Sequence, residues 1–222
     1  MNEIRPIRWA DDTLELLDQT RLPMEEITLK VGRYQEAVEA IRQMRVRGAP
    51  AIGVTAAYAM ALAAREIESQ AAAGGGQDFL SRLQSAAAEI SSARPTPVNL
   101  AWAVGKQMAL AESLAGSTAA SVEKIEPIWP KLLEQAQRIQ QEDEAVNRLM
   151  GGFGQELIPD GGAVLTHCNA GALATAGYGT AVGVIRAGWE QGKRFQVYNT
   201  ETRPFLQGAR LTSWEFQQLG IP

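Results

Sequence analysis

GGAVLTHCNAGALATAGYGTAVGVIRAGWEQGKRFQVYNTETRPFLQ, residues 161–207, is the stretch that decides the fold. Its apolar run from Ala163 to Thr166 predicts a buried strand, and a helix is expected from Gly171 to about Gln191. A second strand is expected from Arg194 to Tyr198. A strand, a crossover helix and a second strand form a βαβ unit, and such units build parallel sheets.

Reactive side chains are expected where these two strands end. In open parallel sheets, ligands bind at the carboxyl ends of the strands. Both loops leave from that edge, so Cys168, Glu201, Arg203 and Gln207 are predicted to converge there. A thiol at the start of a helix can become a nucleophile or an acid–base group. The alternative is that Cys168 is a small buried hydrophobic residue, as most free cysteines are.

Two neighbouring features of this stretch favour structural roles. His167 is the only histidine, and it would point to the opposite face if the strand register continues. The glycine-rich run GYGTAVG, residues 177–183, looks like part of a dinucleotide-binding motif. It is expected in the middle of a helix rather than between a strand and a helix, so close helix packing is the better interpretation.

The composition is that of an ordinary globular protein. The 222 residues are 45% hydrophobic and 21% charged, with a formal net charge of −4, which gives no reason to expect nucleic-acid or membrane binding. One cysteine excludes an intramolecular disulfide, and one histidine argues against a zinc site, so no metal is expected. The polar start does not resemble a signal peptide, and the apolar run 49–64 is shorter than the roughly 20 residues of a membrane span. A cytoplasmic location is expected.

The first 150 residues predict helices around a small sheet. Three short strands are expected to form an antiparallel sheet: Ile4–Trp9, Thr13–Leu17 and Ile27–Val31. Helical spacing then recurs over Tyr34–Met44, Pro50–Ile67, Phe79–Ser91, Val98–Leu114 and Lys131–Met150, with loops at 71–77 and 115–120. Gly151, Gly152 and Gly154 are expected to end the last of these helices. We therefore predict an α/β protein with a mainly helical domain over 1–150 and part of a Rossmann-like parallel-sheet domain over 151–222.

Two arginines are candidate anion ligands. Arg47 and Gly48 precede Pro50, which suits the first position of a helix, and helix N-termini bind anions. Arg94 precedes two prolines and is held in an extended segment, which suits a substrate phosphate or carboxylate. The alternatives are a solvated Arg47 beside a linker glycine and a surface Arg94 in a proline corner.

The final residues predict a short helix from Leu211 to Leu219, followed by Gly-Ile-Pro. That ending is typical of a βα unit leading into its next strand, and two parallel strands alone make a poor sheet. The chain is therefore expected to stop inside its second domain.

Four motifs together carry a family resemblance. VRGAPAIGV (46–54), ARPTPVNLAWAV (93–104), LTHCNAGALATAGYGTAVGVIRA (165–187) and ETRPFLQGARLTSWE (201–215) closely resemble the methylthioribose-1-phosphate isomerase family. These aldose–ketose isomerases of methionine salvage are related to the regulatory subunits of translation initiation factor 2B. The resemblance implies conversion of 5-methylthioribose-1-phosphate to the ribulose phosphate, no cofactor, and a homodimer at full length.

The resemblance also implies residue roles. Cys168 matches the family's catalytic cysteine, and the substrate-binding positions are Arg47, Gly48, Ala49, Arg94 and Gln207. The family's catalytic aspartate and an Asn-Lys pair lie beyond the Gly-Ile-Pro, so the 222-residue chain is expected to be an inactive fragment. Two other functions stay open: a non-catalytic initiation-factor-2B-like subunit, and a related isomerase acting on ribose-1,5-bisphosphate.

Overall fold

The computed structural model describes residues 3–72, 79–118 and 127–222, and it has the predicted α/β architecture. Strands β1 (Ile7–Ala10), β2 (Thr13–Leu17) and β3 (Thr28–Val31) form an antiparallel sheet in the order β1-β2-β3. Asp11 and Asp12 join the first two strands at φ angles of 49° and 56°. Two left-handed residues match the turn that fits the twist of a hairpin, and aspartate tolerates this conformation. The predicted small sheet is confirmed.

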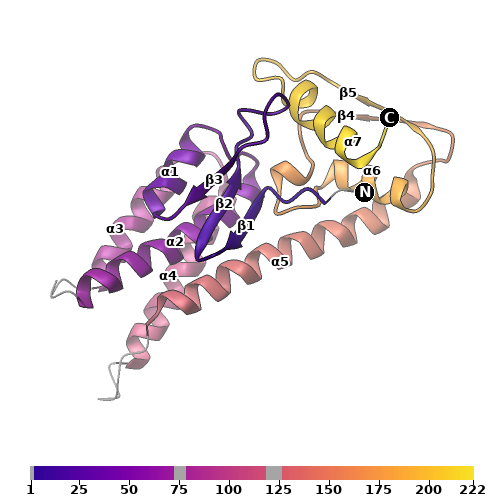
Figure 1. The fold of residues 1–222 in the computed structure, drawn as a ribbon. Helices are drawn as coiled ribbons and strands as arrows, with labels where there is room; N and C mark the ends of the chain where they lie inside the picture. The colour runs from indigo at the N-terminus through magenta and orange to yellow at the C-terminus, as the bar shows by residue number, and fades with distance from the viewer. Residues whose placement is uncertain (1–2, 73–78, 119–126) are drawn as a thin grey trace.

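Five helices follow: α1 (Tyr34–Arg42), α2 (Ala49–Ala72), α3 (Phe79–Ser91), α4 (Val98–Thr118) and α5 (Trp129–Gly154). Helix α2 is the centre of this part and contacts α1, α3, α4 and α5. Every residue from Ala51 to Ala64 is buried, because its many alanines let the neighbouring helices pack on all sides. Figure 1 shows α5 as the long helix that runs from this helical part to the C-terminal elements. The loops predicted at 71–77 and 115–120 are wrong where the structure describes them, because 71–72 belong to α2 and 115–118 to α4; their other residues lie outside the described ranges.

Of the three glycines expected to end α5, Gly151 and Gly152 lie inside the helix, whereas Gly154 is its last residue. The helix continues to Gly154, and a 3₁₀ turn η1 (Gln155–Leu157) follows directly. An added Cβ at Gly151 would lie 2.9 Å from the carbonyl oxygen of Gly183. The glycine therefore allows close packing against another helix, and this packing gain outweighs the low helix propensity of glycine.

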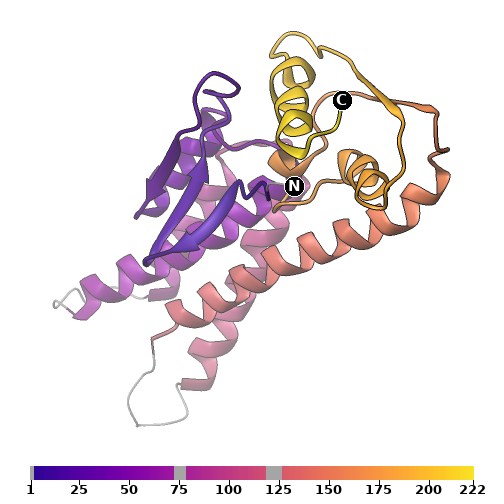
Figure 2. The same cartoon turned by 45° about the vertical axis from the view of Figure 1, so that its right-hand side comes forward.

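The C-terminal part contains the predicted βαβ unit. Strand β4 (Ala163–Thr166) pairs in parallel with β5 (Gln196–Asn199), and helix α6 (Ala181–Glu190) connects them. A 3₁₀ turn η2 (Ala172–Ala174) precedes α6; a π-helical turn η3 (Gly208–Thr212) leads into α7 (Ser213–Leu219). Figure 2 shows α6 and α7 on the same side of the molecule as the C-terminal half of α5.

Two expectations for this unit were wrong. The helix begins at Ala181 and not at Gly171, because Gly177 and Gly179 have φ angles of 154° and 97° that interrupt helical geometry. The glycine-rich run 177–183 therefore lies mostly in the turn before α6. Its last three residues, 181–183, form the first turn of the helix, where an added Cβ at Gly183 would meet the ring of Tyr178 at 3.0 Å.

The parallel strand pair is covered on one face. Val164 and Val197 pack against the apolar core of the C-terminal part, whereas Leu165 and Tyr198, paired in register, are 70% and 52% exposed. The prediction of a buried strand over 163–166 is therefore wrong for the described residues. The side chains of β4 are apolar on the uncovered face as well as on the face that packs against the core. In the sequence such a strand looks the same as one that is buried on both faces.

Buried apolar side chains form two clusters, one around α2 and the other around α6 and α7. The division into domains at residue 150 stays a prediction, since α5 belongs to both neighbourhoods: it packs against α2 and against α6. Among the described residues, no helix is long and apolar enough to cross a membrane.

Candidate functional site

Cys168 is held by backbone contacts from two directions. Its N–H donates to Thr202 Oγ1 at 2.9 Å, and its carbonyl oxygen accepts a hydrogen bond from Thr212 Oγ1 at 2.6 Å. Its φ is 62°, a left-handed conformation that few side chains adopt. Such a backbone persists only where the surroundings enforce it, and it is typical of functional sites. The expected helix N-terminus is absent here, because α6 begins only at Ala181.

A buried carboxylate organises the residues that follow the cysteine. Glu215 of α7 is 0% exposed and accepts hydrogen bonds from the N–H groups of Ala172 (2.7 Å) and Leu173 (3.2 Å). It also accepts one from Asn169 Nδ2 at 2.7 Å. An added Cβ at Gly171 would lie 2.2 Å from Glu215 Oε2, so only glycine permits this approach. The carboxylate thus fixes the shape of residues 169–173.

The charge state of Glu215 reflects opposing influences. Burial raises the pKa of this carboxyl, while the hydrogen bonds from Asn169, Leu173 and Ala172 and the charge of Arg47 act in the other direction. Sequence reasoning missed this residue. The available signal was its spacing, since Leu211, Glu215 and Leu219 recur every four residues on the apolar face of a helix. A carboxylate on such a face needs partners.

Arg47 reaches the same segment from the N-terminal part of the chain. Its guanidinium donates to Asn169 Oδ1, and its Nη2 donates to the Asn169 carbonyl oxygen at 3.0 Å. Burial lowers the pKa of Arg47, and Arg94 acts in the same direction, whereas Cys168 and Glu215 raise it. The two arginines, the thiol and the carboxylate therefore lie within electrostatic range of one another.

Gly48 and Ala49 adjoin this cluster. Gly48 has a φ of 92°, and an added Cβ would lie 2.4 Å from the carbonyl oxygen of Ala174. The start of α2, whose first residue is Ala49, consequently packs directly beside η2. The structure thus brings the start of α2 and η2, which follows the cysteine loop, into one neighbourhood.

Gln207 meets Arg47 at a cavity of about 170 Å³. The lining residues are Gln19, Thr20, Gln43, Met44, Arg47, Phe205, Gln207, Arg210 and Leu211. Cys168 and Arg94 do not line it. The predicted convergence of Glu201 and Arg203 is not seen: both are exposed, and the side chain from this loop that reaches Cys168 is that of Thr202.

His167 lies outside the cluster. It is exposed, and its Nδ1 is 2.7 Å from Thr200 Oγ1. Among the described residues there is no group of three or more His, Cys, Asp or Glu side chains that could hold a metal ion.

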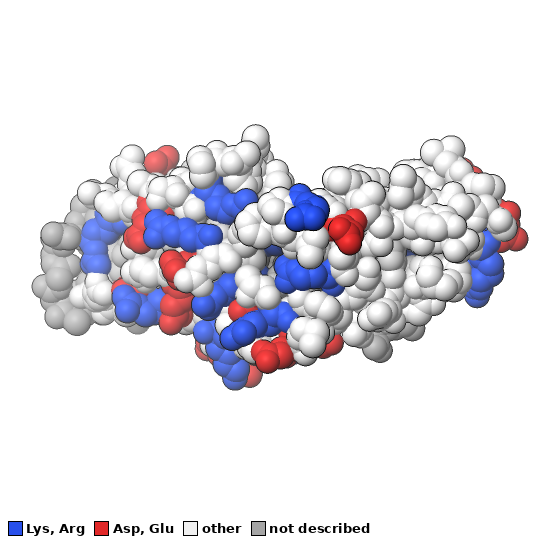
Figure 3. Space-filling view, turned by 90° about the horizontal axis from the view of Figure 1, so that it is seen from above, with Lys and Arg blue, Asp and Glu red and all other residues white. Residues whose placement is uncertain are grey.

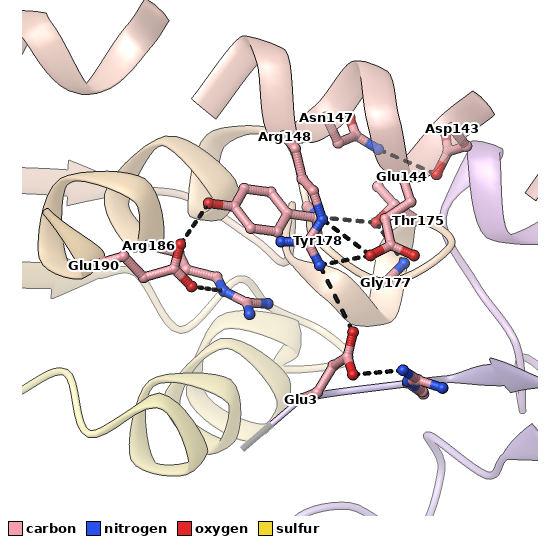
Figure 4. Close-up of polar contacts among 12 residues, drawn as sticks. Glu3, Asp143, Glu144, Asn147, Arg148, Thr175, Gly177, Tyr178, Arg186 and Glu190 are labelled. Carbon is pink, nitrogen blue, oxygen red and sulfur yellow. Dashed lines mark hydrogen bonds and ion pairs between the residues drawn. The ribbon is translucent and has the colours of Figure 1, made fainter. Parts of the chain in front are cut away.

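The turn before α6 is anchored to α5 by polar contacts (Figure 4). Asp143 accepts hydrogen bonds from the Ala176 N–H at 2.8 Å and from Asn147 at 3.1 Å. Tyr178 lies between two guanidinium groups, Arg148 and Arg186, each 4.6 Å from its ring centre. Burial, followed by Glu190, raises the pKa of Tyr178 to about 12, so it stays neutral and donates to Glu190. Two helices thus hold the segment that follows Cys168. Glu215 of α7 binds Asn169 and Ala172, and Asp143 of α5 binds Ala176, which follows η2.

Comparison with known proteins identifies the family. Residues 45–222 match the initiation factor 2 subunit family. The chain belongs to this family. It is 51% identical over 220 residues to the methylthioribose-1-phosphate isomerase of Pelotomaculum thermopropionicum, covering 97% of this chain and 57% of the relative. It is 46% identical to the enzyme of the same name from Synechocystis sp., covering 100% of this chain and 61% of the relative.

Solved structures of the initiation factor 2 subunit family share the fold. The 5-methylthioribose 1-phosphate isomerase of Pyrococcus horikoshii OT3 has a TM-score of 0.84 at 35% identity, over 98% of this chain and 58% of that one. The delta subunit of translation initiation factor eIF-2B from A. fulgidus has a TM-score of 0.82 at 39% identity, over 98% and 60%. The chain therefore spans about three fifths of the length of these relatives. Figure 3 shows basic and acidic side chains interspersed over the N-terminal and central parts of one face, whereas the C-terminal part is mostly uncharged except at its outer edge.

Proposed function

We propose that this chain carries the cysteine and part of the substrate site of an isomerase that converts 5-methylthioribose-1-phosphate to 5-methylthioribulose-1-phosphate. The names of relatives 46–51% identical to it support this proposal. The observation that carries it is the half-buried Arg47 guanidinium, which donates hydrogen bonds to Asn169, the residue after Cys168, and whose pKa is lowered first by burial and also by Arg94. Two positive charges beside a thiol suit a phosphate-bearing substrate and a reactive cysteine.

The chemistry needs no external redox partner, because the electrons only move within the substrate. The phosphate on C1 blocks opening through a free hemiacetal, so the ring oxygen has to be protonated as the ring opens. Hydrogen then moves from C2 to C1, which turns the aldose into a ketose. Cys168 acts at this C1–C2 step, as the base or as an electrostatic partner. Buried apolar neighbours such as Ala172 and Leu173 keep water out, which strengthens the effect of nearby charges.

Each substrate-binding residue has a proposed role. Arg47 and Arg94 bind the phosphate through their guanidinium groups, since a planar fork can make two aligned hydrogen bonds. Gly48 and Ala49 offer the backbone at the start of α2, and Gln207 contacts the sugar from the cavity it shares with Arg47. The ligand is thus a small sugar phosphate and not a nucleic acid.

Two other functions compete with this one. The fold alone does not separate the isomerase from an initiation-factor-like regulatory subunit, because the solved structures with those two titles are almost equally similar. Cys168 favours the enzyme, since a non-catalytic subunit has no need of a thiol in a strained backbone. Ribose-1,5-bisphosphate would require a second cationic site. Arg210 lines the cavity, yet it already donates to the carbonyl oxygens of Leu22 and Phe205.

We further propose that a protein of the relatives' full length is a cytoplasmic homodimer with its domain boundary near residue 150. An exposed apolar stripe along the end of α5 and η1 supports an interface. Its members, 43–86% exposed, recur at helical spacing: Val146, Leu149, Met150, Phe153 and Leu157.

Replacing the thiol tests the proposed function. In a protein of the relatives' length that carries this sequence, Cys168→Ser should lower kcat at least about a hundredfold, because a hydroxyl is a far weaker acid than a thiol. The thermal midpoint should change little, since the two side chains are similar in size. Turnover of 5-methylthioribose-1-phosphate and thermal unfolding are measured on the same preparation. Retained kcat with a lower midpoint would show that Cys168 is only a packing residue.

A further inference from the structure

Asn169, the residue after Cys168, lies between the arginine of the site and the buried carboxylate of α7. It is 4% exposed, and both ends of its amide form hydrogen bonds. Oδ1 accepts from Nη1 of Arg47, while Nδ2 donates to Glu215 Oε1 at 2.7 Å and to Thr212 Oγ1 at 3.2 Å. The backbone carbonyl oxygen of Asn169 accepts a second hydrogen bond from Arg47, through Nη2 at 3.0 Å. One residue thus joins a cation to a carboxylate without letting them touch.

The groups on either side fix the orientation of this amide. A guanidinium has only donors, and the oxygen atoms of Glu215 already accept from two backbone N–H groups. Turning the amide over would set Nδ2 against the donors of Arg47 and Oδ1 against the oxygen atoms of Glu215, and both contacts would repel. Oδ1 therefore faces the arginine. Aspartate at this position would oppose two carboxylates, and leucine would leave both partners unpaired, so the position requires one acceptor end and one donor end.

The buried arginine of α6 is held in a different way. Arg186 is 5% exposed, and its Nε donates directly to Glu190 Oε1 at 2.7 Å as an ion pair. Arg47, in contrast, forms no ion pair with any carboxylate within residues 3–72, 79–118 and 127–222. A carboxylate in direct contact would compete with phosphate, because both anions take the same paired hydrogen bonds from a guanidinium. Asn169 takes two of the five N–H donors and adds no charge.

We propose that Asn169 is a positioning residue, which orients the Arg47 guanidinium for the substrate phosphate and keeps the Glu215 carboxylate from pairing with it. Arg47 is half-buried and lines the cavity of about 170 Å³. Asn169 also ties the arginine to the cysteine, since Thr212 accepts from Asn169 and donates to the Cys168 carbonyl oxygen at 2.6 Å. This inference rests on the proposed function, because it requires that Arg47 binds phosphate.

Exchanging the amide and the carboxylate tests the proposal on the 222-residue chain. The double variant Asn169→Asp/Glu215→Gln keeps one amide and one carboxylate, but the carboxylate now contacts Arg47 directly. Calorimetric titration should show that inorganic phosphate binds about 10- to 100-fold more weakly than to wild type, the range of one charge-assisted hydrogen bond. A change in the number of carboxylates does not explain such a loss, because that number is the same in both proteins.

Glu215→Gln alone is the reference for stability. In this variant and in the double variant, one of the backbone N–H groups of Ala172 and Leu173 loses its acceptor. Urea unfolding should therefore give the two variants similar stabilities. Their phosphate affinities should differ, since the single variant keeps Asn169 and should bind phosphate at least as tightly as wild type. A residue with a purely structural role would change affinity and stability together.

An uncharged substitution decides the question if the double variant does not fold. Asn169→Ser shortens the side chain so that it no longer spans from Arg47 to Glu215, and phosphate binding should weaken about 3- to 10-fold. Asn147→Ser is the matched control, because Asn147 of α5 is 3% exposed and also donates to a carboxylate, that of Asp143, at 3.1 Å. It should lower stability as Asn169→Ser does and leave phosphate affinity within about twofold of wild type.

The outcomes separate this inference from the proposed function. If the double variant binds phosphate as wild type does, or if Asn169→Ser and Asn147→Ser weaken binding equally, Asn169 only holds its loop and this inference alone is wrong. If the variants behave as expected but 5-methylthioribose-1-phosphate binds wild type no more tightly than phosphate does, the proposed substrate is wrong and the role of Asn169 at an anion site is supported. If wild type does not bind phosphate, both proposals are contradicted.

Discussion

The helical part around α2 and the C-terminal part around Cys168 are built on different principles. Around α2, every residue from Ala51 to Ala64 is buried, and small side chains let four helices pack against one. Around Cys168, the backbone is fixed by polar contacts from Thr202, Thr212 and Glu215. Close packing of small side chains leaves little room for added residues, but it does not depend on particular hydrogen-bond donors and acceptors. A polar network specifies one geometry, which is what a site requires.

The comparison also concerns how completely each part is covered. The α2 cluster is enclosed by its own helices, whereas the β4–β5 pair leaves Leu165 and Tyr198 exposed on one face. A parallel pair with an open apolar face is unusual, because parallel sheets are normally covered on both faces. The helical part should therefore behave as an independent unit, and the site should be sensitive to changes that leave the helices intact.

The largest expected effect concerns turnover. The resemblance places the family's catalytic aspartate after the Gly-Ile-Pro, and the 222 residues contain no matching segment. We expect the 222-residue chain to convert 5-methylthioribose-1-phosphate at least about 10²–10⁴-fold more slowly than a relative of full length, the usual cost of losing a positioned acid–base group. If the 222-residue chain binds 5-methylthioribose-1-phosphate without converting it, the substrate-binding contacts around Cys168 would be separated from the catalytic step. Turnover close to that of the relative would contradict the assignment of the aspartate.

Removing the carboxylate of Glu215 should affect one part only. Glu215→Ala leaves Asn169, Ala172 and Leu173 without their acceptor and should cost about 3–5 kcal/mol locally. Hydrogen exchange should accelerate in η2, β4 and α6, while the amides of α2 keep their protection. Glu134→Ala is the control, because Glu134 forms exposed ion pairs with Lys131 and Arg138 that contribute at most about 1 kcal/mol. Equal acceleration in α2 would show that the two parts unfold as one unit.

The same contrast explains what the sequence could predict. Helix α3, strand β2 and strand β4 have the predicted bounds, because local periodicity alone determines them. The contacts of Glu215 join residues more than 40 positions apart, and no local pattern contains that pairing. The late start of α6 was missed because the positive φ angles at Gly177 and Gly179 go with tertiary contacts and not with apolar spacing: Gly177 lies beside Glu144 of α5, and Gly179 pairs with Gly171. Cys168, Gln207 and the two arginines were already candidates from the residue pattern, and the motif resemblance assigned their roles, whereas Glu215 became visible only through its contacts.

Arg94→Lys should weaken binding while the charge is kept. Lysine cannot reproduce the two aligned hydrogen bonds of a guanidinium on phosphate. Because a charge-assisted hydrogen bond contributes about 1.5–3 kcal/mol, affinity for 5-methylthioribose-1-phosphate should fall by about one to two orders of magnitude. Sulfate should compete with this probe in the wild type and less well in the variant. Arg203→Lys, at an exposed position, should change neither measurement. Equal competition by sulfate in both arginine variants would remove Arg94 from the phosphate site.

The smallest effect is a pH dependence that tests which influence dominates at Glu215. Burial raises the pKa of Glu215 in the folded chain, despite its three hydrogen bonds and the charge of Arg47. A carboxyl with a raised pKa binds more protons folded than unfolded. Its contribution to the free energy of unfolding is therefore complete below the unfolded pKa of about 4.3 and is lost as pH rises through the folded pKa. Glu215→Gln removes this titration, so the stability difference between wild type and variant should be larger at low pH than at neutral pH.

Urea unfolding at pH 4.5 and pH 7.5 measures that difference. Glu156→Gln serves as the matched control, because it makes the same chemical change at an exposed position. Asp143→Asn should resemble Glu215→Gln in sign, since burial also raises the pKa of Asp143, which anchors the turn before α6. If the wild-type advantage over Glu215→Gln grows with pH, the hydrogen bonds and Arg47 outweigh burial. The Glu215 carboxylate would then act as a charged partner of Arg47, with Asn169 between them. It would not act as a neutral, buried hydrogen-bonding group.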